Sequence, residues 1–268
     1  MKKNLNLKKG STKWTYQTSF SNTYTAINKT INSISFKERH RLTDTAFTRK
    51  RTLDFPTLIL YLLNLGKQSN QTELDQFFKV IQNKKEASEV ITKSAFFQAR
   101  KQLSYTAFQS LNRQVVNNVY QGEWKPKTWM GFRLCAIDGT SIRLPNEPNI
   151  TEYFGFQKGR SEQGECSMGM ASVFYDVLNK IVIDSAIHPR RVAEKACVEE
   201  HLQYTQENDL VLFDRGYVAF WLYAYLLQHN IRFCMRAKTN QCLLVKDFVK
   251  SGKSEAIVTF VANAPSVQ

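Results

Sequence analysis

Paired cysteines are the first feature that this sequence lacks. Its 268 residues include five cysteines, an odd number, and no two of them stand in a C-x-x-C pair. This spacing indicates neither a disulfide framework nor a structural zinc site, and it is typical of a reducing compartment. Buried thiols are expected at the three positions that lie in apolar or helical runs, Cys135, Cys197 and Cys234.

Long apolar runs are also missing. The longest, from Leu58 to Leu65, is far shorter than the roughly 20 residues that a membrane-spanning helix needs. The lysines after Met1 resemble the start of a signal peptide, but no apolar segment follows them. We therefore expect a cytoplasmic protein with no membrane partner.

Acidic residues are scarce in the first half of the chain. Residues 1–130 hold 22 Lys and Arg against 8 Asp and Glu, whereas residues 131–268 hold 15 of each, so the net charge of +14 lies in the first half. This asymmetry predicts a basic module that binds a polyanion, joined to a neutral module with another task. A basic surface that is merely solvated is the simpler alternative.

The first half has the patterns of a helical domain. A helical pattern begins at Phe36, and the run from Thr52 to Pro56 is typical of a helix start. Two short helices are predicted next, the first capped by Thr72 and the second by Thr92 or Ser94. The second is basic, and the pair fits a helix-turn-helix, although any basic amphipathic helix with a solvated face has this pattern.

Two basic clusters are candidates for DNA contacts. One is on the predicted second helix and the other is a run just before residue 52, where side chains can reach phosphate groups. The pattern breaks between residues 122 and 131, so we assign residues 1–125 to a helical, basic DNA-binding domain. The candidate DNA-binding residues are Arg49, Lys50, Arg51, Lys93, Arg100 and Lys101.

The second half is rich in predicted strands. They cover residues 132–137, 167–175, 181–187, 209–213 and 231–236, and residues 140–144 continue the first strand after a turn. Helices are predicted at residues 192–206 and 220–228. The order of these elements predicts a mixed α/β sheet.

Two aspartates stand where predicted strands end. Asp138 follows the apolar run that begins at Leu134, and Asp214 follows the run that begins at Leu210. If the two strands are neighbours, the carboxylates can hold metal ions for phosphodiester chemistry, although 76 residues separate them. Either aspartate could instead simply begin a turn, because Asp before Gly or Arg-Gly is common turn chemistry.

Four segments together carry a resemblance to a known family. In this order along the chain, they are similar to segments of the DDE transposases of bacterial insertion sequences, in the insertion-sequence-four group. The last two match the first and second acidic motifs of that family. The segments are Phe47–Phe55, Thr92–Leu103, Ala136–Thr140 and Asp214–Tyr217.

The resemblance implies a fold, an activity and a set of partners. It implies a ribonuclease H-like catalytic core at residues 131–240, with Asp138 on its first strand and Asp214 at the end of its fourth. Both would bind Mg²⁺, or Mn²⁺ in its place, to cut double-stranded DNA at the element ends and join it to target DNA. A homodimer in a synaptic complex is implied as well. Arg215, Arg236 and Lys238 are suited to hold the DNA backbone beside the site.

The third acid of the family pattern is missing. In the family it is a Glu in Tyr-x₂-Arg-x₃-Glu-x₆-Lys, on a helix that follows a β-rich insertion. The one Glu after Asp214 is Glu255, and Phe248, Ser251 and Ala262 stand in place of the Tyr, Arg and Lys. Strand-like segments at residues 242–249 and 256–261 look like the start of that insertion, which we place at residues 241–268. We therefore expect a C-terminally truncated chain without the third catalytic Glu.

Two functions follow from these patterns. The first is a Mg²⁺-dependent transposase that is catalytically incomplete in this chain. The second is a non-catalytic DNA-binding fragment that occupies element ends and competes with intact transposase.

Overall fold

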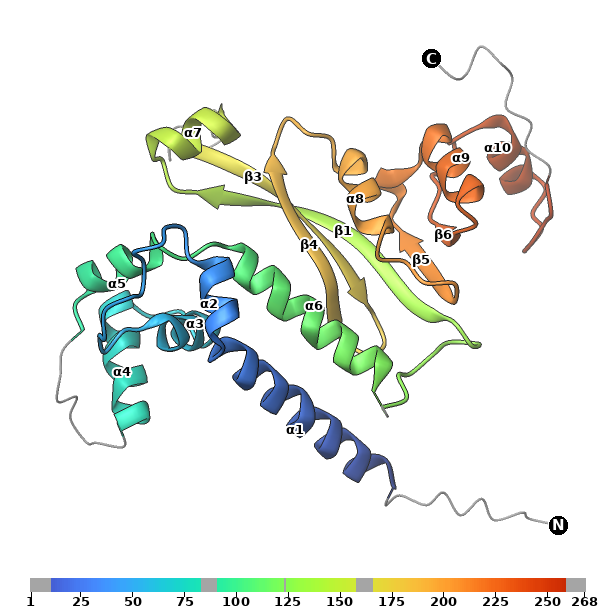
Figure 1. Ribbon diagram of the computed structural model, residues 1–268. Coiled ribbons are helices and arrows are strands. Elements are labelled where there is room, and N and C mark those ends of the chain that lie inside the picture. Colours follow the sequence, from blue (N-terminus) through green and yellow to red (C-terminus); the bar gives the residue numbers. More distant parts are fainter. Residues whose placement is uncertain (1–10, 83–90, 123, 158–165, 259–268) are drawn as a thin grey trace. The chain divides into compact units, whose positions relative to one another are not determined.

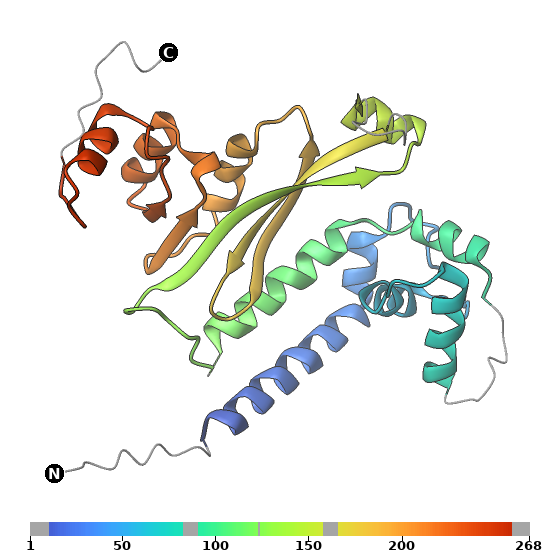
Figure 2. The same cartoon turned by 180° about the vertical axis from the view of Figure 1, so that it is seen from behind.

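The chain divides into two compact units, residues 1–124 and 125–268. The computed structural model describes residues 11–82, 91–122, 124–157 and 166–258, except for the side chains of residues 11–20. Within these ranges no helix is both long and apolar enough to cross a membrane. Figures 1 and 2 show the elements of both units from opposite sides.

Unit 1 folds as helices around one apolar core. Its largest fully buried side chains include Phe55, Leu58, Tyr61, Leu74 and Phe96. The elements are α1 (Ser11–Ile31), α2 (Ile34–His40), α3 (Phe55–Leu63), α4 (Asn70–Gln82), α5 (Lys93–Arg100) and α6 (Thr106–Gln121).

Side-chain caps set where several of these helices begin. Asp54 Oδ1 accepts from Thr57 N–H at 3.0 Å at the start of α3, with a proline in the first turn. Thr92 caps α5 by accepting from Ala95 N–H at 3.2 Å, as predicted. The predicted cap at Thr72 is wrong, because α4 begins two residues earlier and the Thr72 N–H itself donates to Ser69 Oγ.

Helix α1 has no clear signature in the sequence. It is rich in Ser, Thr and Asn, which favour helices only weakly, and the helical pattern is recognisable only from Phe36 onward. Ile31 at its end is nevertheless buried in the core, and Ile27 packs against that core. The helix also contacts α2 and α6. Tertiary packing, rather than local preference, therefore stabilises α1.

Unit 2 is built on a mixed sheet, as the sequence predicted. Strand β1 (Arg133–Leu144) lies between β3 (Cys166–Asp176), to which it is antiparallel, and β5 (Asp209–Phe213), to which it is parallel. Strand β6 (Arg232–Met235) adds in parallel beyond β5, and β3 pairs with β4 (Ile181–Pro189) and with the short β2 (Phe156–Gln157). The strand order is therefore β4-β3-β1-β5-β6, with β2 on the same side of β3 as β4.

Short helices complete unit 2. The 3₁₀ helix η1 (Glu194–Cys197) runs directly into α8 (Val198–Leu202), and the 3₁₀ helix η2 (Arg215–Tyr217) follows β5. Side chains of α8 and α9 pack with β1, β3 and β5 in one core that includes Ile137, Phe174, Val198, Val211 and Leu222. The remaining helices are α7 (Pro148–Phe154), α9 (Phe220–Gln228) and α10 (Leu243–Lys250).

Several expectations for unit 2 are wrong in detail. The helix predicted at residues 192–206 is confined to η1 and α8, and residues 242–249 are mainly the helix α10 rather than a strand. Residues 256–258 form no strand, and residues 259–261 lie outside the described residues. Cys135 and Cys197 are buried, but Cys234 is exposed on β6, because only one face of that strand packs on the core.

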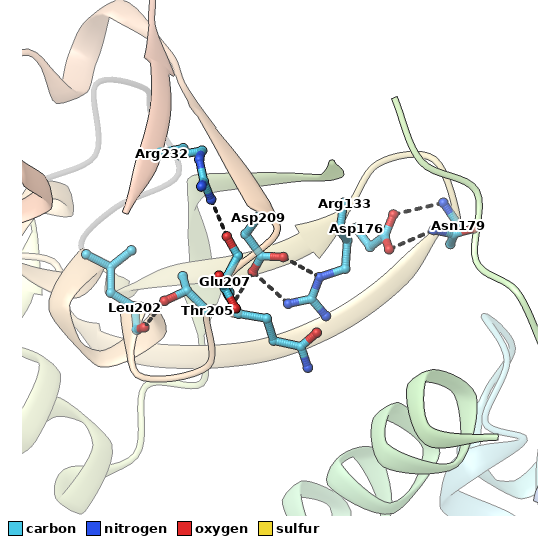
Figure 3. A network of polar contacts seen from close by, with 9 residues as sticks. Arg133, Asp176, Asn179, Leu202, Thr205, Glu207, Asp209 and Arg232 are labelled. Carbon is cyan, nitrogen blue, oxygen red and sulfur yellow. Dashed lines mark hydrogen bonds and ion pairs between the residues drawn. The ribbon is translucent and has the colours of Figure 1, made fainter. Parts of the chain in front are cut away.

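A buried ion pair joins β1 to β5 (Figure 3). Arg133 Nε donates to Asp209 Oδ1 and Arg133 Nη2 to Asp209 Oδ2, each at 2.7 Å, and both side chains are buried. Asp209 Oδ2 also accepts from Gln206 N–H at 2.9 Å. The two ion-pair partners are register neighbours, so the bond fixes which residues of β1 and β5 stand side by side.

A second polar network fixes α8 on the sheet. His201 is fully buried, with Nδ1 at 2.8 Å from Asp184 Oδ2 and Nε2 at 2.9 Å from Ser172 Oγ. The carboxylate on β4 can only accept, so the ring donates to it from Nδ1, while Nε2 hydrogen-bonds the serine hydroxyl on β3. One side chain thus ties α8 to two strands.

We expect His201→Ala to lower the free energy of unfolding of unit 2 by roughly 2 kcal/mol, because it leaves buried polar groups without their partner. Urea unfolding followed by circular dichroism measures this. His188→Ala is the matched control, since His188 bonds to the half-exposed Glu200 and should change stability by less than about 1 kcal/mol. Equal losses in the two variants would contradict the role of His201.

Candidate active site

Asp138 lies on β1, and Asp214 directly follows β5, the parallel neighbour of β1. The last recorded pair of β1 and β5 is Ala136 with Leu212, and each aspartate stands two residues further along its strand. The backbone is still extended at Asp214, with φ −74° and ψ 168°. Neighbouring strands lie about 4.8 Å apart, and residues at equal register face the same side of the sheet. The sheet therefore places the backbones of the two aspartates beyond the same end of one strand pairing, although 76 residues separate them in the sequence.

Both aspartates are exposed. Asp214 lies at the predicted strand end, whereas Asp138 does not. Asp214 follows β5 and begins η2, as a strand-end residue should. Asp138 instead lies inside β1, which continues to Leu144 without a turn, because its other edge stays paired with β3. The predicted turn at Asp138-Gly139 is therefore wrong. The pairing of β1 with β5 nevertheless ends just before Asp138, at Ala136 and Leu212.

A third carboxylate, that of Glu194, lies beside residues that neighbour this pair in the sequence, and no sequence motif marked it. Glu194 Oε1, on η1, accepts from the Tyr217 hydroxyl at 2.8 Å. The same oxygen stands 2.5 Å from where a Cβ on Gly139 would be, so the glycine after Asp138 makes room for it. No local sequence pattern marks Glu194, because the residues beside it, Gly139 and Tyr217, are distant from it in the sequence.

The electrostatics of Tyr217 reflect the same arrangement. Burial raises the pKa of the Tyr217 phenol, and the hydrogen bond to Glu194 and the charges of Glu194 and Asp138 raise this pKa further. The hydroxyl is therefore a permanent donor at ordinary pH. The negative charges of Glu194 and Asp138 both act on this hydroxyl.

Basic side chains predicted to hold DNA stand close to the second aspartate in the sequence and the fold. Arg215 directly follows Asp214 and is exposed on η2. Arg236 directly follows β6, and its N–H donates to Phe213 O at 3.1 Å, which places its backbone beside the end of β5. Lys238 is exposed two residues further on.

Within unit 1, one of the two predicted DNA-binding clusters borders a groove. This groove of about 600 Å³ is lined by Arg49 and Arg51 of that cluster, by Ala95 and Gln98 of α5, and by Gln102, which follows α5. The other cluster, Lys93, Arg100 and Lys101, does not line it. All six predicted side chains are exposed: Arg49, Lys50, Arg51, Lys93, Arg100 and Lys101.

Helices α4 and α5 are held together by one glutamine. Gln71 on α4 donates from Nε2 to Ile91 O and accepts at Oε1 from Lys93 N–H, both at 3.0 Å. This bidentate contact fixes the start of α5 relative to α4. The Arg100 guanidinium lies over the Phe97 ring, 5.7 Å from its centre, and is thereby held near the end of α5.

The two aspartates suit one kind of metal ion. Mg²⁺ keeps several of its waters and binds through one or two carboxylates together with phosphate oxygens of the substrate. Two exposed carboxylates on adjacent strands fit that requirement. Across the described residues, no group of three or more His, Cys, Asp or Glu side chains is placed to hold a metal ion without a substrate.

Glu255 has no place in this arrangement. It is exposed, and it lies outside any helix or strand. Its neighbours in the sequence do not match those of the third acid in the family pattern.

The fold and the two acidic motifs agree with the match of this chain to a transposase family. The family model described as Transposase DDE domain matches residues 129–262, which is half of the chain. The chain therefore belongs to this family, as its motifs indicated. The match includes both aspartates and Glu194.

One curated relative is a bacterial protein. "Putative transposase InsZ" of Escherichia coli (strain K12) is 26% identical over 148 residues, which are 55% of this chain and 48% of that protein. This chain thus spans about half the length of the curated relative that it matches.

Solved structures of transposases show a weak likeness. The piggyBac transposase synaptic complex with hairpin DNA aligns over 87% of this chain and 54% of that chain, at 11% identity and a TM-score of 0.44. The Mos1 transposase paired-end complex with the left transposon end aligns over 76% of this chain and 85% of that one, at 12% identity and a TM-score of 0.27. Scores this low add no weight to the family assignment.

Proposed function

We propose that this chain is a transposase of an insertion sequence that binds element-end DNA and takes part in metal-dependent strand cleavage and transfer. The observation that carries the proposal is that Asp138 on β1 and Asp214 after β5 each stand two residues beyond the last pair of these parallel strands. Membership of the DDE transposase family supports the same chemistry. A mixed sheet with one acid on its central strand and another beside it is what a ribonuclease H-like core, at residues 131–240, requires.

The side chains around the acid pair have distinct tasks in this proposal. Asp138 and Asp214 hold Mg²⁺, or Mn²⁺ in its place, and Arg215, Arg236 and Lys238 hold the DNA backbone. When bound, the cation supplies Lewis-acid stabilisation to the phosphodiester oxygens. The protein contributes the fixed spacing of the two carboxylates, which the Arg133–Asp209 pair maintains five residues earlier on the same strands.

Unit 1 supplies the affinity for DNA. Its groove combines Arg49 and Arg51 with Gln98 of α5 and Gln102 just after α5, and glutamine side chains can pair with adenine in the major groove. The exposed basic residues around it are suited to phosphate contacts, which position a protein without reading sequence. Residues 1–125 therefore form the DNA-binding domain in this proposal, and two chains would meet on paired element ends.

A second function is favoured by one observation. The chain's one Glu after Asp214, Glu255, is exposed and outside any helix, so it cannot stand in for the third acid. A chain that binds element ends through unit 1 without cutting them would compete with intact transposase. Residues 241–268 would then contribute nothing to catalysis.

Cleavage of DNA that carries the ends of the encoding element, with Mn²⁺ present, distinguishes the two functions. If the chain cuts, we expect Asp138→Asn and Asp214→Asn each to reduce the rate roughly 100-fold or more, because even outer-shell changes at metal sites cost 10–100-fold. Asp247→Asn, at an exposed position on α10, is the matched control and should retain the rate.

The outcomes separate cleanly. Cleavage that disappears in both site variants but not in the control supports the enzyme. Salt-sensitive binding without any cleavage favours the competing fragment. Cleavage that persists in Asp138→Asn would show that the acid pair is not the site.

A further inference from the structure

The segment between β4 and β5 reaches both acid-bearing segments. Glu194 lies on η1, more than 50 residues after Asp138 and 20 residues before Asp214. Its carboxylate is half-buried, and η1 contacts both β3 and η2. A single short helix therefore touches the strand that pairs with Asp138 and the turn that Asp214 begins.

The contacts of Glu194 are specific on both sides. On one side, Oε1 lies 2.5 Å from the position that a Cβ on Gly139 would take. On the other side, the same oxygen accepts from the hydroxyl of Tyr217, a residue that is 1% exposed. The oxygen thus fills the space between the residue that follows Asp138 and the residue that ends η2.

A neighbouring contact reinforces the second side. Lys195 Nζ donates to Val218 O at 3.0 Å. Two consecutive residues of η1 thus hydrogen-bond to the last residue of η2 and to the residue that follows it. The Lys195 ammonium donates to a carbonyl oxygen there, and the Glu194 carboxylate accepts from a hydroxyl group. The position of η2, which begins at Asp214, therefore depends on η1.

The position of η1 is itself fixed by a buried network. The helix α8 continues η1 directly, and His201 ties α8 to Ser172 and Asp184. Ser172 is the residue of β3 that stands opposite Gly139 in the register of β1 and β3. A continuous set of contacts thus runs from the β1 strand at Gly139, through β3 and α8, to η1 and Tyr217.

We propose that Glu194 and Tyr217 are positioning residues, whose hydrogen bond braces the two segments that carry Asp138 and Asp214 and so sets the spacing of the two carboxylates for a divalent cation. The inference rests on the proposed function of the acid pair. Glu194 acts here through its contacts with Gly139 and Tyr217 rather than as a ligand.

Two features of the site follow from this brace. The glycine at residue 139 leaves room for the brace, because a methyl group there would displace the Glu194 carboxylate. The tyrosine must keep its hydroxyl, because a phenylalanine would fill the same core space and still leave Glu194 without its donor. The motif Asp214–Tyr217 then contains a metal ligand at its start and the brace at its end.

Binding of Mn²⁺ to the full chain without DNA tests the proposal, with the free ion measured by electron paramagnetic resonance. We expect Tyr217→Phe and Glu194→Ala each to raise the Kd for Mn²⁺ roughly tenfold, as second-shell changes commonly do. Glu194→Gln should change it less than about threefold, because the amide oxygen can still accept from Tyr217. Tyr153→Phe and Glu199→Ala, at exposed positions, should retain the Kd of the unaltered chain.

Each alternative outcome has a definite meaning, and thermal unfolding checks that every variant is folded. A loss in Glu194→Gln as large as in Glu194→Ala would overturn the inference, since the carboxylate charge and not the brace would then matter. Mn²⁺ binding that is lost in Asp138→Asn but unchanged in Tyr217→Phe and Glu194→Ala would overturn this inference alone. Binding that is unchanged in Asp138→Asn and Asp214→Asn would overturn the acid site, and the brace with it.

Discussion

Asp209→Ala is expected to lower the free energy of unfolding of unit 2 by about 3–5 kcal/mol, because it leaves the buried Arg133 guanidinium without its carboxylate. Both side chains are almost fully removed from water, at 6% and 1% exposure, so solvent does not screen the loss. The variant also removes the acceptor of Gln206 N–H. Chemical denaturation followed by tryptophan fluorescence and circular dichroism measures the change.

The control for this prediction separates the ion pair from the packing. The double variant Arg133→Met with Asp209→Leu replaces both charges by apolar groups and should recover much of the stability, since buried pairs replaced in this way are often neutral or better. Glu207→Ala, at an exposed position beside the pair, should change stability by less than about 1 kcal/mol. A loss below about 1 kcal/mol in Asp209→Ala would contradict the role that we assign to the pair.

Removing three cations from either predicted DNA-binding cluster of unit 1 is expected to change how DNA binding depends on salt. For Arg49, Lys50 and Arg51 replaced together by Ala, the slope of log affinity against log salt should become shallower by about three, because each lost phosphate contact removes about one released counterion. The affinity at low salt should fall at least roughly tenfold. Replacing Lys93, Arg100 and Lys101 together should have a similar effect. Fluorescence anisotropy across a salt series measures both quantities.

The matched control removes the same charge elsewhere in unit 1. Lys29, Lys67 and Lys79 are exposed and belong to neither cluster, and their joint replacement by Ala also lowers the net charge by three. We expect this variant to keep most of the affinity. If it loses as much as the two cluster variants, net charge rather than these clusters binds the DNA.

Local patterns in the sequence were enough for much of the fold. The predicted strand at residues 209–213 and the predicted helix at 220–228 match β5 and α9, because short apolar runs between turn residues have few alternatives. The start of α3 was readable from Asp54 and Pro56, whose capping chemistry acts within a few residues. The charge asymmetry and the two acidic motifs were readable in the same way, and with them the family to which the chain belongs.

Where the elements meet was decided only by the tertiary structure. Whether Asp138 and Asp214 stand side by side depends on the parallel pairing of β1 with β5, and the buried Arg133–Asp209 pair sets that register. Glu194 became visible as a neighbour of the site only through Gly139 and Tyr217, which are distant from it in sequence. Local preferences act over a few residues, whereas these contacts form only after the sheet has assembled, so no short segment carries their signature.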